Sequence, residues 1–446
     1  MAAERHEKKD WSFALMPCLS AMAAAVAGVA GGAKADPAIM DAAWRDALAT
    51  LEQVLSALCG SLRNADTVRT RPVNVLTTGG WARVRYPYAP GKVTGRTAVA
   101  MLCGGPEGKK RRPKATEAAR LRIAKGAALL GSYAESRNFL AGECGMDAGR
   151  ETHRRIANEA GRRTRAAVAK GRGAACPRPR AWTPPEGAVP MAKTHFVLAD
   201  GKAFPCVKKD LRGRRGRNGG AAKKRNANLL VVATSEWTDR RGRPLFAPGS
   251  VRYHPTGAGG AALADELWLV GGQEGVRENG PRLQYLTDGE EELEYVYQML
   301  FASWPNSTRT LDAMHACGYV DTLCKLLAPD PAAADKASRA LRRKLVEKGW
   351  SGFEKAFRRR FARTPPETLS GDAAKAWNYL AKRSHQMDYP GYRRRHLSVG
   401  SGMVESGCKN IFGTRLEGPG MRWRFANGLG IATLRAQLKS GRPIFA

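Results

Sequence analysis

Acidic residues are scarce in this chain of 446 residues, which has 40 Asp and Glu against 74 Lys and Arg. The formal net charge of +34 makes a basic partner unfavourable at neutral pH and makes a polyanion the expected one. Nucleic acid is the usual polyanion for a protein of this charge. Charge alone also leaves open a ribosome-associated or membrane-surface protein, because it reports on partners and not on chemistry.

Paired cysteines and long apolar runs are also lacking. The nine cysteines include no C-x-x-C pair and their number is odd, which argues against a zinc ribbon and favours a reducing compartment. No stretch of about 20 strongly apolar residues is present, so no membrane span is expected. The Ala-rich run from Trp11 to Gly32 imitates a secretion signal, but Pro17 interrupts it and acidic residues precede it. We therefore expect a cytoplasmic, nucleoid-associated protein without a signal peptide.

The N-terminal part of the chain is predicted to be mostly helical. Apolar residues recur every three or four positions from Ala42 to Arg63, which is typical of an amphipathic helix. We assign residues 1–80 to a helical N-terminal region. The Pro-rich stretch 171–187 cannot be the interior of a helix or sheet, and we interpret it as a linker.

Residues 81–170 are interpreted as a DNA-binding region. The basic loop Lys109–Lys114 leads into two short helices around Gly145, a pattern that fits a helix-turn-helix. His153 and Arg154 are then available to phosphates or base edges. A plain helical hairpin in a basic protein would look similar, and that alternative stays open.

A mixed α/β domain is expected to follow, built from 188–322 and 391–425. Strands and helices alternate along its first part, which is typical of a mixed sheet. The expected strands are His195–Val207, Asn228–Trp237, Pro244–His254, Arg282–Thr287 and Thr308–Ala313. The expected helices are Ala261–Leu269 and Glu290–Phe301.

The helical segment 323–390 is interpreted as an insertion into this domain, and 426–446 as a C-terminal tail. Trp350, Phe353, Phe357 and Phe361 are spaced for one helix face. Such a stripe is more often core than a surface for base stacking.

A cationic loop separates the first two expected strands. Lys208–Arg225 contains nine Lys and Arg residues, with glycines that make a turn. Such a run is often only a solvated loop, but this one lies one strand away from Asp200. We therefore predict that Arg214, Arg215 and Arg217 hold a nucleic-acid backbone.

Three acids in this basic chain stand where a metal site can form. Asp200 and Asp288 each follow an apolar strand and precede a glycine, and Glu405 lies on a helix that follows Gly400. Each alone has an ordinary explanation, a turn or an i,i+4 ion pair. Together they provide the oxygen ligands that two Mg²⁺ or Mn²⁺ ions need for reaction at a phosphodiester. Near Glu405, we expect contacts with DNA from Lys409, Arg415, Arg422 and Trp423.

Four blocks of sequence resemble one family. They are GSGMVESGCKNIFGTRLEGPGMRW (Gly400–Trp423), MDYPGYRRR (Met387–Arg395), TDGEEELEYVYQMLFASWPNSTRTLDAMHA from Thr287, and LADGKAFP from Leu198. Together they resemble the transposases of ISKra-type insertion sequences, members of the DDE class, over roughly residues 132–434. The block that contains Glu405 is the specific one.

The resemblance implies an RNase H-like fold in which Asp200, Asp288 and Glu405 are the catalytic metal ligands. It also implies that Asp312 and His315 form the Asp-x-x-His motif found between the second aspartate and the glutamate in several such enzymes. A structural hydrogen bond is the other explanation for that pair.

The function implied is metal-dependent cleavage and strand transfer at the ends of a mobile element. The partners would be double-stranded DNA, as terminal repeats and target, and further copies of the chain in a dimer or higher oligomer. Two alternatives stay open: an RNase H-fold nuclease without strand transfer, and a catalytically inactive or purely DNA-binding descendant.

Overall fold

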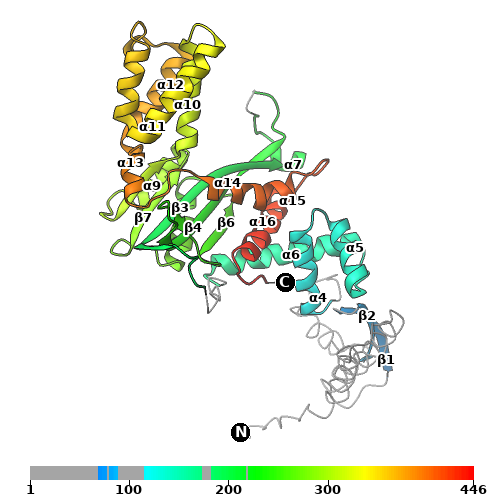
Figure 1. Cartoon of the computed structure of the whole chain (residues 1–446). Coiled ribbons are helices and arrows are strands. Elements are labelled where there is room, and N and C mark those ends of the chain that lie inside the picture. Colours follow the sequence, from blue (N-terminus) through cyan, green and yellow to red (C-terminus); the bar gives the residue numbers. More distant parts are fainter. Residues whose placement is uncertain (1–68, 78–79, 89–114, 173–181, 217–218, 446) are drawn as a thin grey trace, which may run out of the picture. The chain divides into compact units, whose positions relative to one another are not determined.

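The computed structural model describes residues 69–77, 80–88, 115–172, 182–216 and 219–445 (Figure 1). These residues form two compact units, divided between Ala160 and Gly161. The helix expected at Ala42–Arg63 and the basic loop Lys109–Lys114 lie outside the described residues. In the described ranges, no helix combines the length and apolar character that crossing a membrane requires.

The first unit contains a hairpin and helices. Strands β1 (Arg69–Thr77) and β2 (Gly80–Tyr88) pair antiparallel. The helical assignment of 1–80 is therefore wrong for Arg69–Thr77, where valines at alternate positions favour a strand. The helices are α4 (Glu117–Leu129), α5 (Tyr133–Cys144) and the first half of α6 (Arg150–Ala169). Gly145 ends α5 with φ 64°, as the predicted turn requires, but α6 is a long helix of 20 residues and not a short one.

The second unit is built on a mixed sheet of six strands. Their order is β5-β4-β3-β7-β8, with β6 also paired to β4. Strand β4 is antiparallel to β3 and to β6, whereas β7 is parallel to β3 and to β8. The strands are β3 (Val189–Pro205), β4 (Lys224–Thr238), β5 (Pro244–Leu245), β6 (Val251–Thr256), β7 (Arg282–Thr287) and β8 (Ser307–Leu311). The predicted mixed α/β architecture is confirmed.

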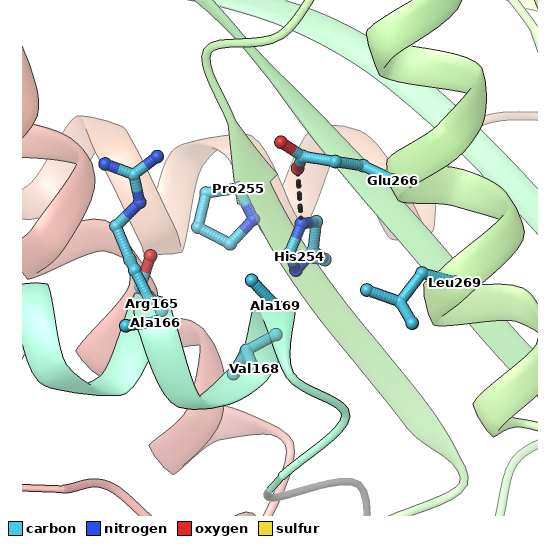
Figure 2. Close-up of a pocket in the computed structure, with 9 residues that line it drawn as sticks. Arg165, Ala166, Val168, Ala169, His254, Pro255, Glu266 and Leu269 are labelled. Carbon is cyan, nitrogen blue, oxygen red and sulfur yellow. Dashed lines mark hydrogen bonds and ion pairs between the residues drawn. The ribbon is translucent and has the colours of Figure 1, made fainter.

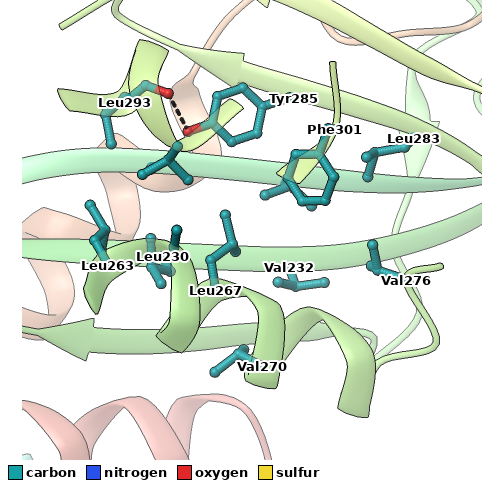
Figure 3. Close-up of a cluster of buried hydrophobic side chains, with 14 of the residues drawn as sticks. Leu230, Val232, Leu263, Leu267, Val270, Val276, Leu283, Tyr285, Leu293 and Phe301 are labelled. Atoms are coloured by element: carbon teal, nitrogen blue, oxygen red, sulfur yellow. Dashed lines mark hydrogen bonds between the residues drawn. The ribbon is translucent and has the colours of Figure 1, made fainter. Parts of the chain in front are cut away.

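Helices cover both faces of this sheet. Helices α8 (Gly260–Gln273) and α9 (Glu291–Leu300) pack on one face, where Val197, Leu230, Leu267 and Tyr285 belong to a buried apolar cluster (Figure 3). Helices α14 (Gly402–Cys408) and α16 (Phe425–Lys439) pack on the sheet through β3, β4 and β6. The segment assigned to a C-terminal tail is thus largely a core helix, since Leu429, Ile431 and Leu434 of α16 are buried.

A helical segment stands between β8 and α14. It comprises α10 (Ala313–Leu327), α11 (Pro331–Arg360), α12 (Gly371–Lys382) and α13 (Tyr389–Arg394). Helix α11 is kinked at Gly349, whose φ of 68° favours glycine. The aromatic stripe is core as predicted: Phe353 and Phe357 are fully buried, and Phe357 lies 4.8 Å from the Trp377 ring. Two further α-helices are short, α7 (Lys208–Leu211) and α15 (Thr414–Leu416).

A buried ion cluster ties the C-terminal segment to the sheet. The Glu274 carboxylate accepts from Arg252 at 3.1 Å and Arg442 at 2.7 Å, and both guanidinium side chains are only 1% exposed. We predict that Glu274→Ala lowers the free energy of unfolding by about 3–5 kcal/mol, because it leaves two buried cations without this carboxylate. Urea denaturation of the full chain measures the change.

The matched control is Glu236→Ala, which removes the partner of Lys193 from a pair with side chains 52% and 43% exposed. This variant should change the free energy of unfolding by less than about 1 kcal/mol. Equal effects of the two substitutions would contradict the structural role of Glu274.

Candidate active site

The pairing of β3 with β7 brings the two predicted aspartates level with each other. Thr194 of β3 pairs with Arg282 of β7, an offset of 282 − 194 = 88 residues, and this register runs to Leu198 and Leu286. Asp200 and Asp288 are also separated by 288 − 200 = 88, so continuing the same register by two residues places them side by side. Adjacent strands lie about 4.8 Å apart, and residues in register point to the same face of the sheet.

Helix α14 brings Glu405 to that face. Its Gly407 sits directly on the sheet, because a Cβ atom there would lie 2.8 Å from a Leu229 side-chain atom and 2.9 Å from one of Tyr253. Leu229 is the register partner of Asp200 on β4. The close approach allowed by glycine therefore sets the helix that carries Glu405 next to Asp200.

The charges of Asp288 and Glu405 both act on the Asp200 carboxylate. Burial raises the pKa of Asp200, a hydrogen bond with the Cys408 thiol opposes this, and the charges of Asp288 and Glu405 raise the pKa further. Cys408 is itself buried on α14, and burial together with the Asp200 charge raises the pKa of its thiol. The structure thus brings together the three carboxylates that the sequence singles out.

A fourth carboxylate, Glu290, was not predicted as part of this site. Partial burial raises its pKa, and so do the charges of Asp288 and Asp200. One of its carboxylate oxygens would lie 3.9 Å from a Cβ atom at Gly201, beside Asp200. Its position two residues after Asp288, in the same loop, is the signal that would have found it.

The donor set suits a hard divalent cation, since all four acids offer carboxylate oxygens. As the side chains are placed, the described residues contain no group of three or more His, Cys, Asp or Glu that could hold a metal ion. Glu405 Oε1 accepts from the Ser401 hydroxyl at 2.8 Å, and Asp288 Oδ1 accepts from the Glu290 amide at 3.1 Å. Each bond uses one of the two oxygens of its carboxylate. The oxygen ligands therefore suit a hard cation in their chemistry, although the described side chains do not stand in a metal-binding arrangement.

Helix α12 fixes the loop that carries Asp288. The Tyr379 hydroxyl donates to the Asp288 carbonyl oxygen, and Arg383 Nη2 donates to the Gly289 carbonyl oxygen at 2.7 Å. Gly289 has a φ of 82°, and a Cβ atom there would lie only 2.6 Å from the Tyr379 hydroxyl. The helical segment therefore holds one of the site acids through its backbone.

The Asp-x-x-His pair lies at the start of α10. Asp312 is buried and caps the helix, accepting from the amides of Met314 and His315. The His315 side chain is exposed, with its ring 5.5 Å from Tyr319 and 6.0 Å from Tyr379. The two residues are joined by a helix-capping bond, which is the structural explanation left open by the sequence.

The predicted DNA contacts near Glu405 divide into exposed and buried residues. Lys409 and Arg422 are exposed. Arg415 and Trp423 are buried, with the guanidinium 5.0 Å from the indole centre, and Trp423 Nε1 donates to the Leu416 carbonyl oxygen at 3.1 Å. The prediction that Arg415 and Trp423 face DNA is therefore wrong. Both side chains pack within α15 and the segment that follows it. This segment contacts the end of β3, where the Trp423 amide donates to the Pro205 carbonyl oxygen.

The other predicted contacts lie elsewhere in the two units. Arg214 and Arg215 are exposed on the segment that joins β3 to β4, and Arg217 lies outside the described residues. Beyond Asp200 the β3–β4 ladder continues for five residues to Pro205. At about 3.3 Å per residue, the segment with Arg214 and Arg215 therefore begins about 16 Å from Asp200. Arg154 is exposed and paired with Glu151 at 2.5 Å.

The prediction that His153 is available to phosphates or base edges is wrong. It is fully buried, with Nδ1 3.2 Å from the Ser136 hydroxyl, so it cannot reach a phosphate or a base edge. Its burial follows from its position on the face of α6 that also carries the buried Ile156.

A separate cavity of about 270 Å³ contains none of the predicted site residues (Figure 2). His254 and Glu266 meet in its wall, with a hydrogen bond of 2.8 Å, and Arg165 also lines it. Burial acts to raise the pKa of Glu266, but the bond with His254 outweighs it and the pKa is lowered. The pair satisfies two polar side chains in an otherwise largely apolar wall.

Gly407 offers a direct test of how α14 is seated. We predict that Gly407→Ala lowers the free energy of unfolding by about 1–3 kcal/mol, because the added methyl group collides with Leu229 and Tyr253. Gly318→Ala is the matched control, since Gly318 is also helical but has nothing within 4 Å of an added Cβ atom. The control should be stabilised by about 0.5–1 kcal/mol. Thermal unfolding that shows both variants equally stabilised would contradict the close seating of α14.

Comparison with known proteins adds no relative. No protein-family model matches the chain, and no curated protein matches it. The assignment of a function therefore depends on the arrangement of the four carboxylates, the exposed cations and the sequence blocks that resemble a family.

Proposed function

We propose that the protein is a metal-dependent DNA transposase of the DDE class, similar to those of ISKra-type insertion sequences, with an RNase H-like catalytic domain. The observation that carries the proposal is the convergence of Asp200, Asp288 and Glu405 on one face of the sheet. These residues come from segments far apart in the sequence. The mixed sheet, antiparallel through β6, β4 and β3 and parallel through β3, β7 and β8, is compatible with an RNase H-like domain.

Asp200, Asp288 and Glu405 would hold divalent cations, Mg²⁺ or Mn²⁺. A bound pair of such ions supplies activation of an oxygen nucleophile and neutralisation of charge on the phosphate. The protein itself holds the carboxylates together against their mutual repulsion. The strand register and the seating of α14 provide that constraint.

The proposed reaction has two steps at this site. A water molecule attacks a phosphodiester at the end of the element, which frees a 3′-hydroxyl group. That hydroxyl then attacks a phosphodiester of the target DNA, so one P–O bond forms as another breaks. Both ends must be held together for the second step, and we therefore propose a dimer or higher oligomer on DNA.

Exposed cations beyond the end of β3 and after α14 support a DNA partner. Arg214 and Arg215 extend beyond the end of β3, and Arg422 lies next to Trp423, which joins that same strand end. Lys409 follows one residue after Cys408 of α14. These four side chains would contact phosphates and fix the position of the strand relative to the carboxylates.

The site can be tested with a duplex that carries the inverted repeats flanking the gene. We predict Mg²⁺-dependent nicking of this duplex, and a loss of at least about 100-fold in rate for Asp288→Asn, since the site loses about 3 kcal/mol or more of charge stabilisation. Asp265→Asn is the control, because Asp265 is an exposed acid on α8 outside the site. Gel analysis of nicked and joined products measures both steps.

Nicking that persists unchanged in Asp288→Asn would show that Asp288 is not a ligand of the catalytic site. Nicking without joined products would favour a nuclease of the same fold. A chain that binds the duplex but never nicks it would favour an inactive, DNA-binding descendant.

The cationic surface can be tested by the salt dependence of DNA binding. We predict that the triple substitution of Arg214, Arg215 and Arg422 by Ala weakens binding and reduces the slope of log K against log [salt] by about 3, about one for each lost phosphate contact. Fluorescence anisotropy at several salt concentrations gives the slope.

The control is the double substitution of Arg240 and Arg241 by Ala. Both arginines are exposed in the turn that follows Thr238, at the end of β4 away from the β3–β4 segment. Each of these two substitutions should change the slope of log K against log [salt] by less than about 0.5. An equal change of slope per residue in both variants would show that binding follows net charge and not this surface.

A further inference from the structure

Ser401 lies between two carboxylates at the start of α14. Its hydroxyl oxygen is 2.9 Å from Asp312 Oδ2 and 2.8 Å from Glu405 Oε1. The residue is buried, and its backbone amide donates to Asp312 Oδ1 at 3.2 Å. A hydroxyl has one proton, so it donates to one of these carboxylates at a time.

The hydroxyl of Ser401 does not cap its own helix. Ser401 occupies the N-cap position of α14 but makes no side-chain capping bond, whereas Ser132 and Asp330 cap α5 and α11 in the usual way. A serine at this position normally bonds the amide two or three residues on. Here its hydroxyl is directed to the carboxylate of Glu405 instead.

Asp312 is satisfied without that proton. Its carboxylate accepts from three backbone amides, those of Met314 at 3.1 Å, His315 at 3.3 Å and Ser401 at 3.2 Å. Asp312 therefore holds Ser401 in place through the backbone. The hydroxyl proton is then available to Glu405 Oε1, and this bond leaves the second oxygen of the carboxylate for a cation.

We propose that Ser401 is a positioning residue that orients the Glu405 carboxylate for cation binding, with Asp312 as its anchor. The inference rests on the proposed function, because it assigns Glu405 as a metal ligand. The anchor also joins two helices: Asp312 caps α10, and the Ala313 amide donates to the Val399 carbonyl oxygen at 2.9 Å. The start of the helical segment thus sets the start of the helix that carries Glu405.

Direct binding of Mn²⁺ to the full chain, followed by electron paramagnetic resonance, tests the proposal without DNA. We expect Ser401→Ala to weaken Mn²⁺ binding by about 10-fold or more, as loss of a partner that orients a ligand typically does. Ser401→Thr keeps the hydroxyl and should bind within about 3-fold of wild type. The melting temperature and DNA affinity of Ser401→Ala should stay close to wild type.

Ser370→Ala is the matched control, because Ser370 is an exposed N-cap residue that makes no side-chain capping bond. It should leave Mn²⁺ affinity unchanged. Wild-type Mn²⁺ affinity in Ser401→Ala, or a loss that Ser401→Thr shares in full, would overturn the proposal. So would a wild-type chain whose Mn²⁺ binding is unaffected by Glu405→Gln.

The two proposals can fail separately. If the wild-type chain binds Mn²⁺ through Glu405 but does not nick element-end DNA, the transposase assignment fails, and the role of Ser401 is still decided by the Mn²⁺ affinities. If nicking occurs and its Mg²⁺ requirement is the same in wild type and Ser401→Ala, the positioning role fails and the transposase assignment stands.

Discussion

The parallel pairing of β3 with β7 is the constraint on which the site depends. A constant offset of 88 residues runs along the two strands, and the same offset separates Asp200 from Asp288. Two like charges at the ends of adjacent strands repel each other, and the raised pKa of Asp200 reflects burial first and this repulsion second. The pairing of the two strands holds them there against this repulsion. A shift of one residue would turn one carboxylate to the opposite face, which α8 and α9 cover.

The helical segment does more than fill the distance between Asp288 and Glu405. Its helix α12 binds the backbone carbonyl oxygens of Asp288 and Gly289, while the cap of α10 binds Ser401 at the start of α14. Two of the three site acids are therefore held by contacts with one helical segment. The position of this segment and the geometry of the carboxylates are physically coupled.

Local patterns made much of the second unit predictable. The strand Arg282–Thr287 was predicted with its observed bounds, because a short apolar run between Pro281 and an Asp-Gly turn leaves little choice. Ser401 was missed because its bond to Asp312 joins residues 89 apart in sequence. Glu290 was missed although it stands two residues after Asp288, because its approach to Asp200 depends on the pairing of two distant strands. The strand β1 was also missed, although its valines at alternate positions favour a strand and its partner β2 begins close by at Gly80.

Arg415 and Trp423 show where reasoning from residue type fails. An arginine and a tryptophan in a basic, glycine-rich segment are typical of a nucleic-acid contact, yet these two are buried against each other and against the end of β3. Their burial has a consequence for the surface beside them. Because Trp423 bonds the backbone at Pro205 and Val207, its neighbour Arg422 is carried to the base of the β3–β4 segment, near the exposed cations of that segment. The burial of Arg415 and Trp423 thus positions the exposed Arg422 at the base of the β3–β4 segment.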